Sequence, residues 1–132
     1  MKKFNYSLFV LLFIFSSSVY AQSFDIKEGR WSWRINMDMM GQTQSFNYSH
    51  CISKKDLIPQ QQKRGESCNI VDSRYNNNLV TWKVICQSAV GQSISTGKIR
   101  YTETTANGNI DMSVSGMNIK SKISGEYIGS CN

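Results

Sequence analysis

The residues of this chain that could carry chemistry are four cysteines, one histidine and a group of methionines. The histidine, His50, stands directly before Cys51. Catalysis of the Ser-His or Cys-His kind needs a histidine, a free nucleophile and a group that orients the histidine. We expect Cys51 to be oxidised, so we interpret His50 as structural and name no catalytic residue. Pairs of carboxylates stay open as acid–base candidates, because the following could meet in space: Asp38, Asp72, Asp111 and Glu126.

The methionines offer a second chemistry. Met37, Met39 and Met40 lie close together in the sequence, and thioether sulfur is a soft ligand that suits Cu(I) in an exported protein. The same side chains fill irregular cores and pack against tryptophan. The sequence favours core packing, with no cofactor and no metal. A copper(I)-binding or buffering protein that uses these methionines is one alternative, and a small-barrel enzyme is the other.

A third possibility is an apolar ligand, held against one face of a sheet by Trp31, Trp33, Met37 and Trp82. Small β-barrels either hold one molecule in the mouth or are filled by side chains. Our leading hypothesis is therefore a non-catalytic binding or interaction module of the cell envelope. Its partner would be an apolar small molecule or another envelope protein. A nucleic acid is not expected, because no aromatic residues interleave with the basic ones.

The N-terminus has the layout of a secretory signal peptide. Lys2 and Lys3 precede an apolar run at 8–15, and Val19-Tyr20-Ala21 is an acceptable cleavage signal. The apolar run is too short to span a bilayer. We expect a signal peptide at 1–21, a single β domain at 22–132 and a periplasmic location, with no transmembrane segment after cleavage. Without the two lysines, 13 basic residues face 9 acidic ones, a net charge of +4.

The cysteines predict two disulfides. All four follow the cleavage site, and an even number in an exported chain indicates an oxidising compartment. A zinc site would need cysteines clustered as C-x-x-C, which is absent. A turn centred on Asn77 places Cys68 opposite Cys86, which predicts a bond between them. Cys51 is then left for Cys131, and the other two connectivities stay open.

The elements that position these residues are short strands. From Arg30 to Met39 apolar and polar residues alternate without a fault, which predicts one long strand with a buried face. Further strands are expected at about 44–50, 68–74, 79–86 and 93–103, followed by two more up to about residue 127. The pattern predicts an all-β antiparallel meander, forming a strongly curved sheet or a small up-and-down barrel. A Cys51–Cys131 bond would favour closure of the barrel.

Four local features complete the prediction. Ser53 and Asp56 resemble a capping box, so one short helical turn is expected near 53–58. The Asn77 turn also places Asp72 opposite Trp82. Gly97 suggests a bend or bulge in its strand. Asn107-Gly108 is the strongest hairpin signal in the sequence.

Several motifs together resemble one known family, DUF3617, which consists of small exported bacterial proteins of unknown function. The motifs that carry the resemblance are Gly29-Arg30-Trp31, Met37, Met39 and Met40 before Gly41, His50-Cys51-Ile52, Asp56-Leu57, Cys68, Val80-x-Trp82-x-x-x-Cys86, the segment from Gly97 to Tyr101, and Gly129-Ser130-Cys131. The proline residues usual in the family's Met-Gly turn are missing around Gly41. The resemblance implies a periplasmic, β-rich domain, and it transfers no catalytic residues.

Overall fold

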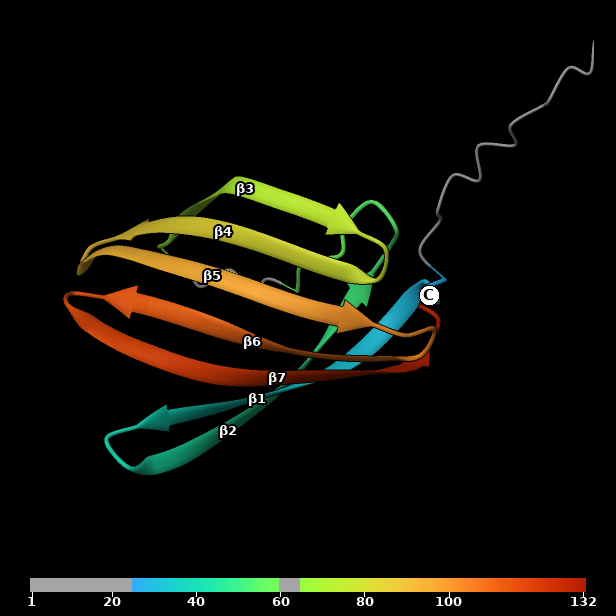
Figure 1. Ribbon diagram of the computed structural model, residues 1–132, viewed down its shortest axis with the longest axis horizontal. Helices are drawn as coiled ribbons and strands as arrows, with labels where there is room; N and C mark the ends of the chain where they lie inside the picture. Colours follow the sequence, from blue (N-terminus) through green and yellow to red (C-terminus); the bar gives the residue numbers. More distant parts are fainter. Residues whose placement is uncertain (1–24, 60–64) are drawn as a thin grey trace, which may run out of the picture.

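A computed structural model describes residues 25–59 and 65–132, and its regular elements are seven antiparallel strands (Figure 1). The strands are β1 (Gly29–Met39), β2 (Gln42–Ile52), β3 (Ser67–Asn76), β4 (Leu79–Ser88), β5 (Gly91–Tyr101), β6 (Thr105–Val114) and β7 (Met117–Gly129). They form one sheet in the order β2-β1-β7-β6-β5-β4-β3. The expected all-β antiparallel fold is confirmed. The expected signal peptide at 1–21 lies outside the described residues and stays a prediction.

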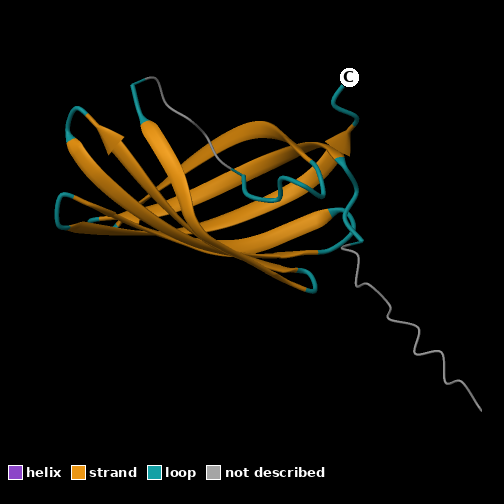
Figure 2. Ribbon diagram, turned by 90° about the horizontal axis from the view of Figure 1, so that it is seen from above, coloured by secondary structure: helices purple, strands orange, loops and turns teal. Residues whose placement is uncertain are grey.

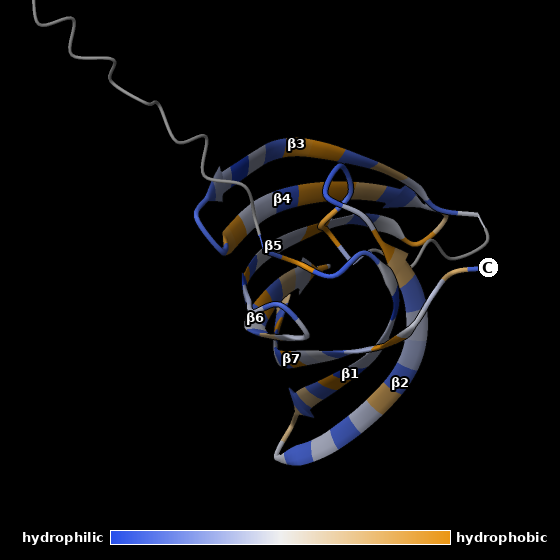
Figure 3. Cartoon of the chain, turned by 90° about the vertical axis from the view of Figure 1, so that its right-hand side faces the viewer, coloured by the Kyte–Doolittle hydropathy of each residue, from blue (hydrophilic) through white to orange (hydrophobic). Residues whose placement is uncertain are grey.

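The sheet is strongly curved and does not close. Figure 3 shows the strands curling round, and within the described ranges 25–59 and 65–132 β2 and β3 form the two free edges of the sheet. Of the two expected forms, the curved sheet is correct and the closed barrel is not. The Cys51–Cys131 bond does form, but it joins the end of β2 to the chain that follows β7. These strands flank β1, so the bond reinforces the β2-β1-β7 part of the sheet and leaves β2 and β3 apart.

The concave face of the sheet carries the core. The alternation along β1 places Trp31 and Trp33 on this face, where both are completely buried. Two tryptophans lie over glycines of the neighbouring strand: Trp33 over Gly125 of β7, and Trp82 over Gly97 of β5. A Cβ atom at either glycine would collide with the indole ring. The large rings therefore fit into a tightly curved sheet because their cross-strand partners have no side chain.

A loop covers part of the concave face. Residues 53–59, here called the cover loop, run across the sheet after β2 (Figure 2). The expected helical turn is not formed, because Ser53 and Asp56 exchange backbone hydrogen bonds of 3.3 and 3.0 Å and close a tight turn between them. This turn directs Leu57 and Ile58 into the core, where each is buried. Burial of these two apolar side chains favours the turn over an exposed helical one.

The turn predicted at Asn107-Gly108 is wrong. Both residues lie inside β6, and the chain reverses earlier, where Thr102 N–H donates to Thr105 O at 2.7 Å. Gly108 is needed for another reason, because a Cβ there would collide with Ile99 of β5. Gly97 is likewise not a bulge, since β5 keeps an unbroken register with both neighbours.

The β3–β4 hairpin confirms one predicted pairing and corrects another. Cys68 lies opposite Cys86 and the two are bonded, with their Cα atoms 4.0 Å apart. The register shifts between Ile70 and Asp72, so Asp72 lies opposite Lys83, and Ser73 takes the place opposite Trp82. The extra residue of this bulge explains why a register counted from the turn fails there.

No helix long and apolar enough to cross a membrane occurs within 25–59 and 65–132.

Candidate functional site

Three of the four residues predicted to contact a ligand are core residues. Trp31 and Trp33 have no exposed surface, and Trp82 is 6% exposed. Met37, the fourth, is half-buried on the same concave face, farther along β1. The structure thus places these four residues on one face. Only Met37 keeps substantial surface for a ligand, and the binding role itself stays a prediction.

The buried rings form one aromatic cluster beneath the cover loop. Trp31 stacks on Trp33 with ring centroids 5.9 Å apart, and Tyr101 meets Trp31 edge-on at 5.8 Å. Trp31 N–H donates to Lys27 O at 2.9 Å. The indole N–H of Trp33 is buried and has no acceptor among the described residues. A buried donor without a partner is rare in folded proteins and is unfavourable.

Beyond the cover loop, the apolar residues of the concave face are only partly buried, and the polar residues Gln44, Ser95 and Ser121 share the face with them. We define the open patch as six residues from four strands that share this face with the core: Ile35, Met37, Phe46, Ile110, Met112 and Ile119. Phe46 of β2 lies opposite Ile35 and is 49% exposed. Ile110 lies opposite Gly97, the glycine covered by Trp82, so the patch continues directly from the core. An exposed apolar surface next to a packed core is typical of a binding site.

The two tyrosines that contact the cover loop have altered acidities. Tyr101 O–H donates to Leu57 O at 2.6 Å, and Tyr48 O–H donates to Pro59 O at 3.4 Å. Desolvation by burial raises the pKa of Tyr48 to about 12. The pKa of Tyr101 is raised further, by burial first and then by the nearby Tyr48 and Asp56. Both groups stay protonated near neutral pH, so both act as hydrogen-bond donors that hold the loop on the sheet.

A family model matches nearly all of the described chain. The model is that of a protein of unknown function (DUF3617), and it covers residues 26–131. The chain belongs to the DUF3617 family. No curated protein and no solved structure shows significant similarity to it.

The four carboxylates named as acid–base candidates lie in four different strands: Asp38 in β1, Asp72 in β3, Asp111 in β6 and Glu126 in β7. Asp38 and Asp111 stand in strands on either side of Lys120, and Thr43 O–H donates to Asp38 at 2.8 Å. Asp72 lies in the edge strand β3, 3.8 Å from Arg74. All four carboxylates are exposed.

The methionines named as copper ligands lie at the tip of the β1–β2 hairpin. Met37 and Met39 share the concave face, and Met39 is 38% exposed. Met40 lies in the turn with φ 50° and is 97% exposed. Copper binding stays a prediction. Glu66, Cys68 and Cys86 also lie close enough to hold an ion, but both sulfur atoms belong to a disulfide and are not available as thiolates.

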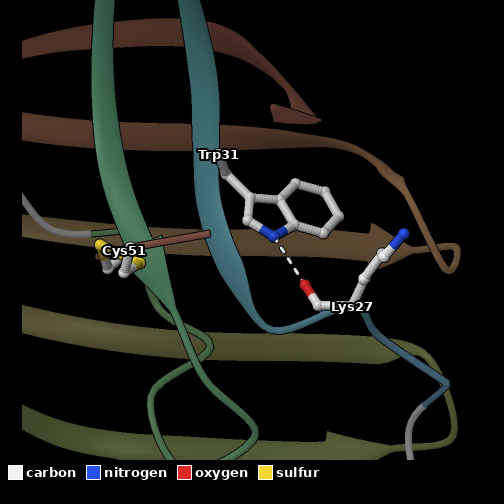
Figure 4. Close-up of a disulfide and its surroundings, with 4 residues drawn as sticks. Lys27, Trp31 and Cys51 are labelled. Carbon is white, nitrogen blue, oxygen red and sulfur yellow. Dashed lines mark hydrogen bonds between the residues drawn. A yellow bond between two sulfur atoms is a disulfide. The ribbon is translucent and has the colours of Figure 1, made fainter. Parts of the chain in front are cut away.

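The N-terminal segment and a disulfide fix the opposite end of the sheet. Figure 4 shows the Cys51 disulfide and the hydrogen bond from Trp31 to Lys27. The backbone N–H of Lys27 donates to the backbone oxygen of Glu103 at 2.9 Å, and the side-chain ammonium of Lys27 lies 4.8 Å from the ring centre of Tyr127. His50 is half-buried on β2, opposite Trp31, and its structural role stays a prediction. This end is thus fixed by the N-terminal segment and by the Cys51–Cys131 disulfide.

Sequence reasoning missed most of the open patch. Phe46, Ile110 and Met112 belong to predicted alternating strands, so the sequence does contain their inward orientation. How much of the concave face the cover loop hides cannot be predicted from the sequence in the same way, because it depends on where the chain after β2 crosses the sheet. A comparison of the long apolar face with the few apolar residues in 53–59 could have indicated that part of it stays open.

Proposed function

We propose that this DUF3617 protein is a non-catalytic binding module of the periplasm that holds an apolar ligand on the open patch. The observation that carries the proposal is the continuity of the patch with the core: apolar residues of β1, β2, β6 and β7 extend beyond the cover loop and keep exposed surface. Burying such side chains against an apolar molecule removes them from water, which stabilises the complex.

The location rests on the cysteines and on the N-terminus. Two disulfides are consistent with an extracellular or periplasmic space. Lys2, Lys3 and the apolar run at 8–15 support export through a cleaved signal peptide. The disulfides and the N-terminal sequence together favour the periplasm as the compartment in which the protein binds its ligand.

The proposal is tested with the apolar dye phenylnaphthylamine, whose fluorescence increases in apolar surroundings. We expect the mature protein to bind it. In the variant Phe46→Asp we expect binding to weaken by roughly ten-fold, because a half-exposed ring contributes about 1–1.5 kcal/mol of apolar burial. The matched control is Asn47→Asp, which adds the same charge to the next residue, on the convex face.

The control separates a local effect from a general one. Asn47→Asp should keep both the dye affinity and the melting temperature of the unchanged protein. Absence of dye binding by the mature protein would contradict the proposal. Equal weakening in both variants would place the dye elsewhere than on the open patch.

A further inference from the structure

The free edge formed by β2 is long and regular. Among the described residues, the backbone of β2 pairs with β1 alone, in an unbroken register from Gly29–Ile52 to Met39–Gln42. The stretch 42–47 is exposed throughout. The whole strand contains no lysine, arginine, acidic residue or proline. The usual features that prevent another strand from pairing with an edge are therefore missing.

The other edge, β3, does have such features. Its register shifts at a bulge between Ile70 and Asp72, which distorts the row of backbone groups. Asp72 and Arg74 add charges of both signs beside that bulge. The two edges of the same sheet thus differ, and β2 is the one prepared to accept a further strand.

The surroundings of β2 indicate which strand would fit. On the concave side, Phe46 and its neighbour Ile35 offer apolar contacts to alternate side chains of an added strand. On the convex side, Arg34 reaches toward the edge and its Nε donates to Asn47 Oδ1 at 3.1 Å. A matching strand therefore alternates apolar residues with uncharged or acidic ones. An acyl chain would fit the apolar face but would leave the backbone groups of the edge unpaired.

We propose that β2 binds an extended polypeptide segment by strand addition, and that the alternate apolar side chains of this segment contact Phe46 at the β2 border of the open patch. The inference rests on the proposed function and names its ligand class as an extended segment of another exported protein. Backbone hydrogen bonds along β2 supply affinity, and the patch selects the side chains.

The test uses a fluorescein-labelled decapeptide of alternating valine and glutamate, with binding followed by fluorescence anisotropy. Successive residues of a strand point their N–H groups to opposite sides within the sheet. We therefore make two variants, Gln44→Pro and Ser45→Pro. In one of them proline removes an N–H group that pairs with β1. In the other it removes an N–H group that points away from the sheet, toward the free edge. The melting temperature tells them apart, because loss of an inner hydrogen bond destabilises the sheet.

We expect the variant that keeps its melting temperature to bind the peptide at least about ten-fold more weakly, since proline blocks the edge. It should bind phenylnaphthylamine with unchanged affinity, because the open patch is intact. Hydrogen exchange should slow within residues 42–48 of the unchanged protein when the peptide is added.

Three results would overturn the inference. They are dye binding without peptide binding, peptide binding that the edge proline does not weaken, and a dimer of the protein that the same proline dissociates without any peptide. The first leaves the proposed function standing, and the third would assign the edge to a second copy of the chain. If the unchanged protein does not bind the dye at all, that result would instead contradict the proposed function itself.

Discussion

Replacing Gly125 with alanine tests the packing on which the fold depends. The added Cβ would lie 2.5, 2.6 and 2.8 Å from the Cζ3, Cε3 and Cη2 atoms of Trp33. Carbon atoms in contact normally lie about 3.5–4.0 Å apart, so the ring would have to move by roughly 1 Å. Trp33 has no exposed surface and is stacked on Trp31, which leaves it little room to move.

The expected cost is about 2 kcal/mol of unfolding free energy. Overpacking of a core costs roughly 1–3 kcal/mol. Alanine offsets up to about 1 kcal/mol of this, because it restricts the unfolded chain more than glycine does. With a urea dependence of about 2 kcal/mol per molar, the midpoint of urea unfolding should fall by roughly 1 M.

A second substitution shows whether the collision is the cause. In Trp33→Leu the ring is gone, so adding Gly125→Ala to that variant should cost less than about 0.5 kcal/mol. A midpoint that is unchanged or raised in Gly125→Ala alone would refute the reasoning. An equal cost of the alanine with and without the Trp33 ring would refute it as well.

Three further changes follow from the cover loop and the disulfides, each measured by urea unfolding. Tyr101→Phe removes a buried hydrogen bond of 2.6 Å to the cover loop; it leaves a carbonyl without its donor and should cost about 2 kcal/mol. In the folded protein the pKa of Tyr48 is raised from 10.0, its value in the unfolded chain, to about 12. The protonated phenol therefore stabilises the folded state fully below pH 10, and this stabilisation is lost as the pH rises toward 12. Stability should therefore decline over that interval by at most about 1.4 kcal/mol per pH unit for this group, and less steeply in Tyr48→Phe. Replacing both Cys51 and Cys131 by alanine should cost about 4 kcal/mol, against about 3 kcal/mol for the hairpin disulfide, because the sequence separations are 80 and 18.

The strands and the disulfides could be predicted because their causes are local or additive. Apolar and polar residues alternate from Trp31 to Met39 with a period of two. Only a β-strand places every second residue of such a segment on one buried face. The turn at Asn77 fixes the register of its hairpin as far as Cys68 and Cys86, and the bulge between them shifts only the pairs in its neighbourhood. Once that bond is set, the two remaining cysteines have only each other.

The errors arose where one residue type serves two purposes. A glycine permits a tight turn, and it also permits close approach of a large side chain from the next strand. Gly108 follows an asparagine, which is typical of a turn, yet it lies under Ile99 in the middle of β6. Gly97 makes room for Trp82 in the same way. Sequence alone does not say which strand will lie next to a glycine, so the choice depends on the complete sheet.

The extent of the open patch could not be predicted, although the inward orientation of its residues could, because the extent depends on the path of the chain after β2. The polar pattern around Ser53 and Asp56 was compatible with a helical turn or with a tight turn. Only the tight turn brings Leu57 and Ile58 into the core. How far the loop then covers the concave face determines which apolar residues stay exposed.

Native mass spectrometry of the protein taken from the periplasm, without refolding, measures whether a ligand is bound to the open patch. We expect the unchanged protein to carry a bound mass, Phe46→Asp to lose it and Asn47→Asp to keep it. A peptide fragmentation pattern of the released ligand would agree with strand addition at β2. A bare mass for the unchanged protein, four hydrogens below that of the reduced chain, would contradict a ligand held on the open patch.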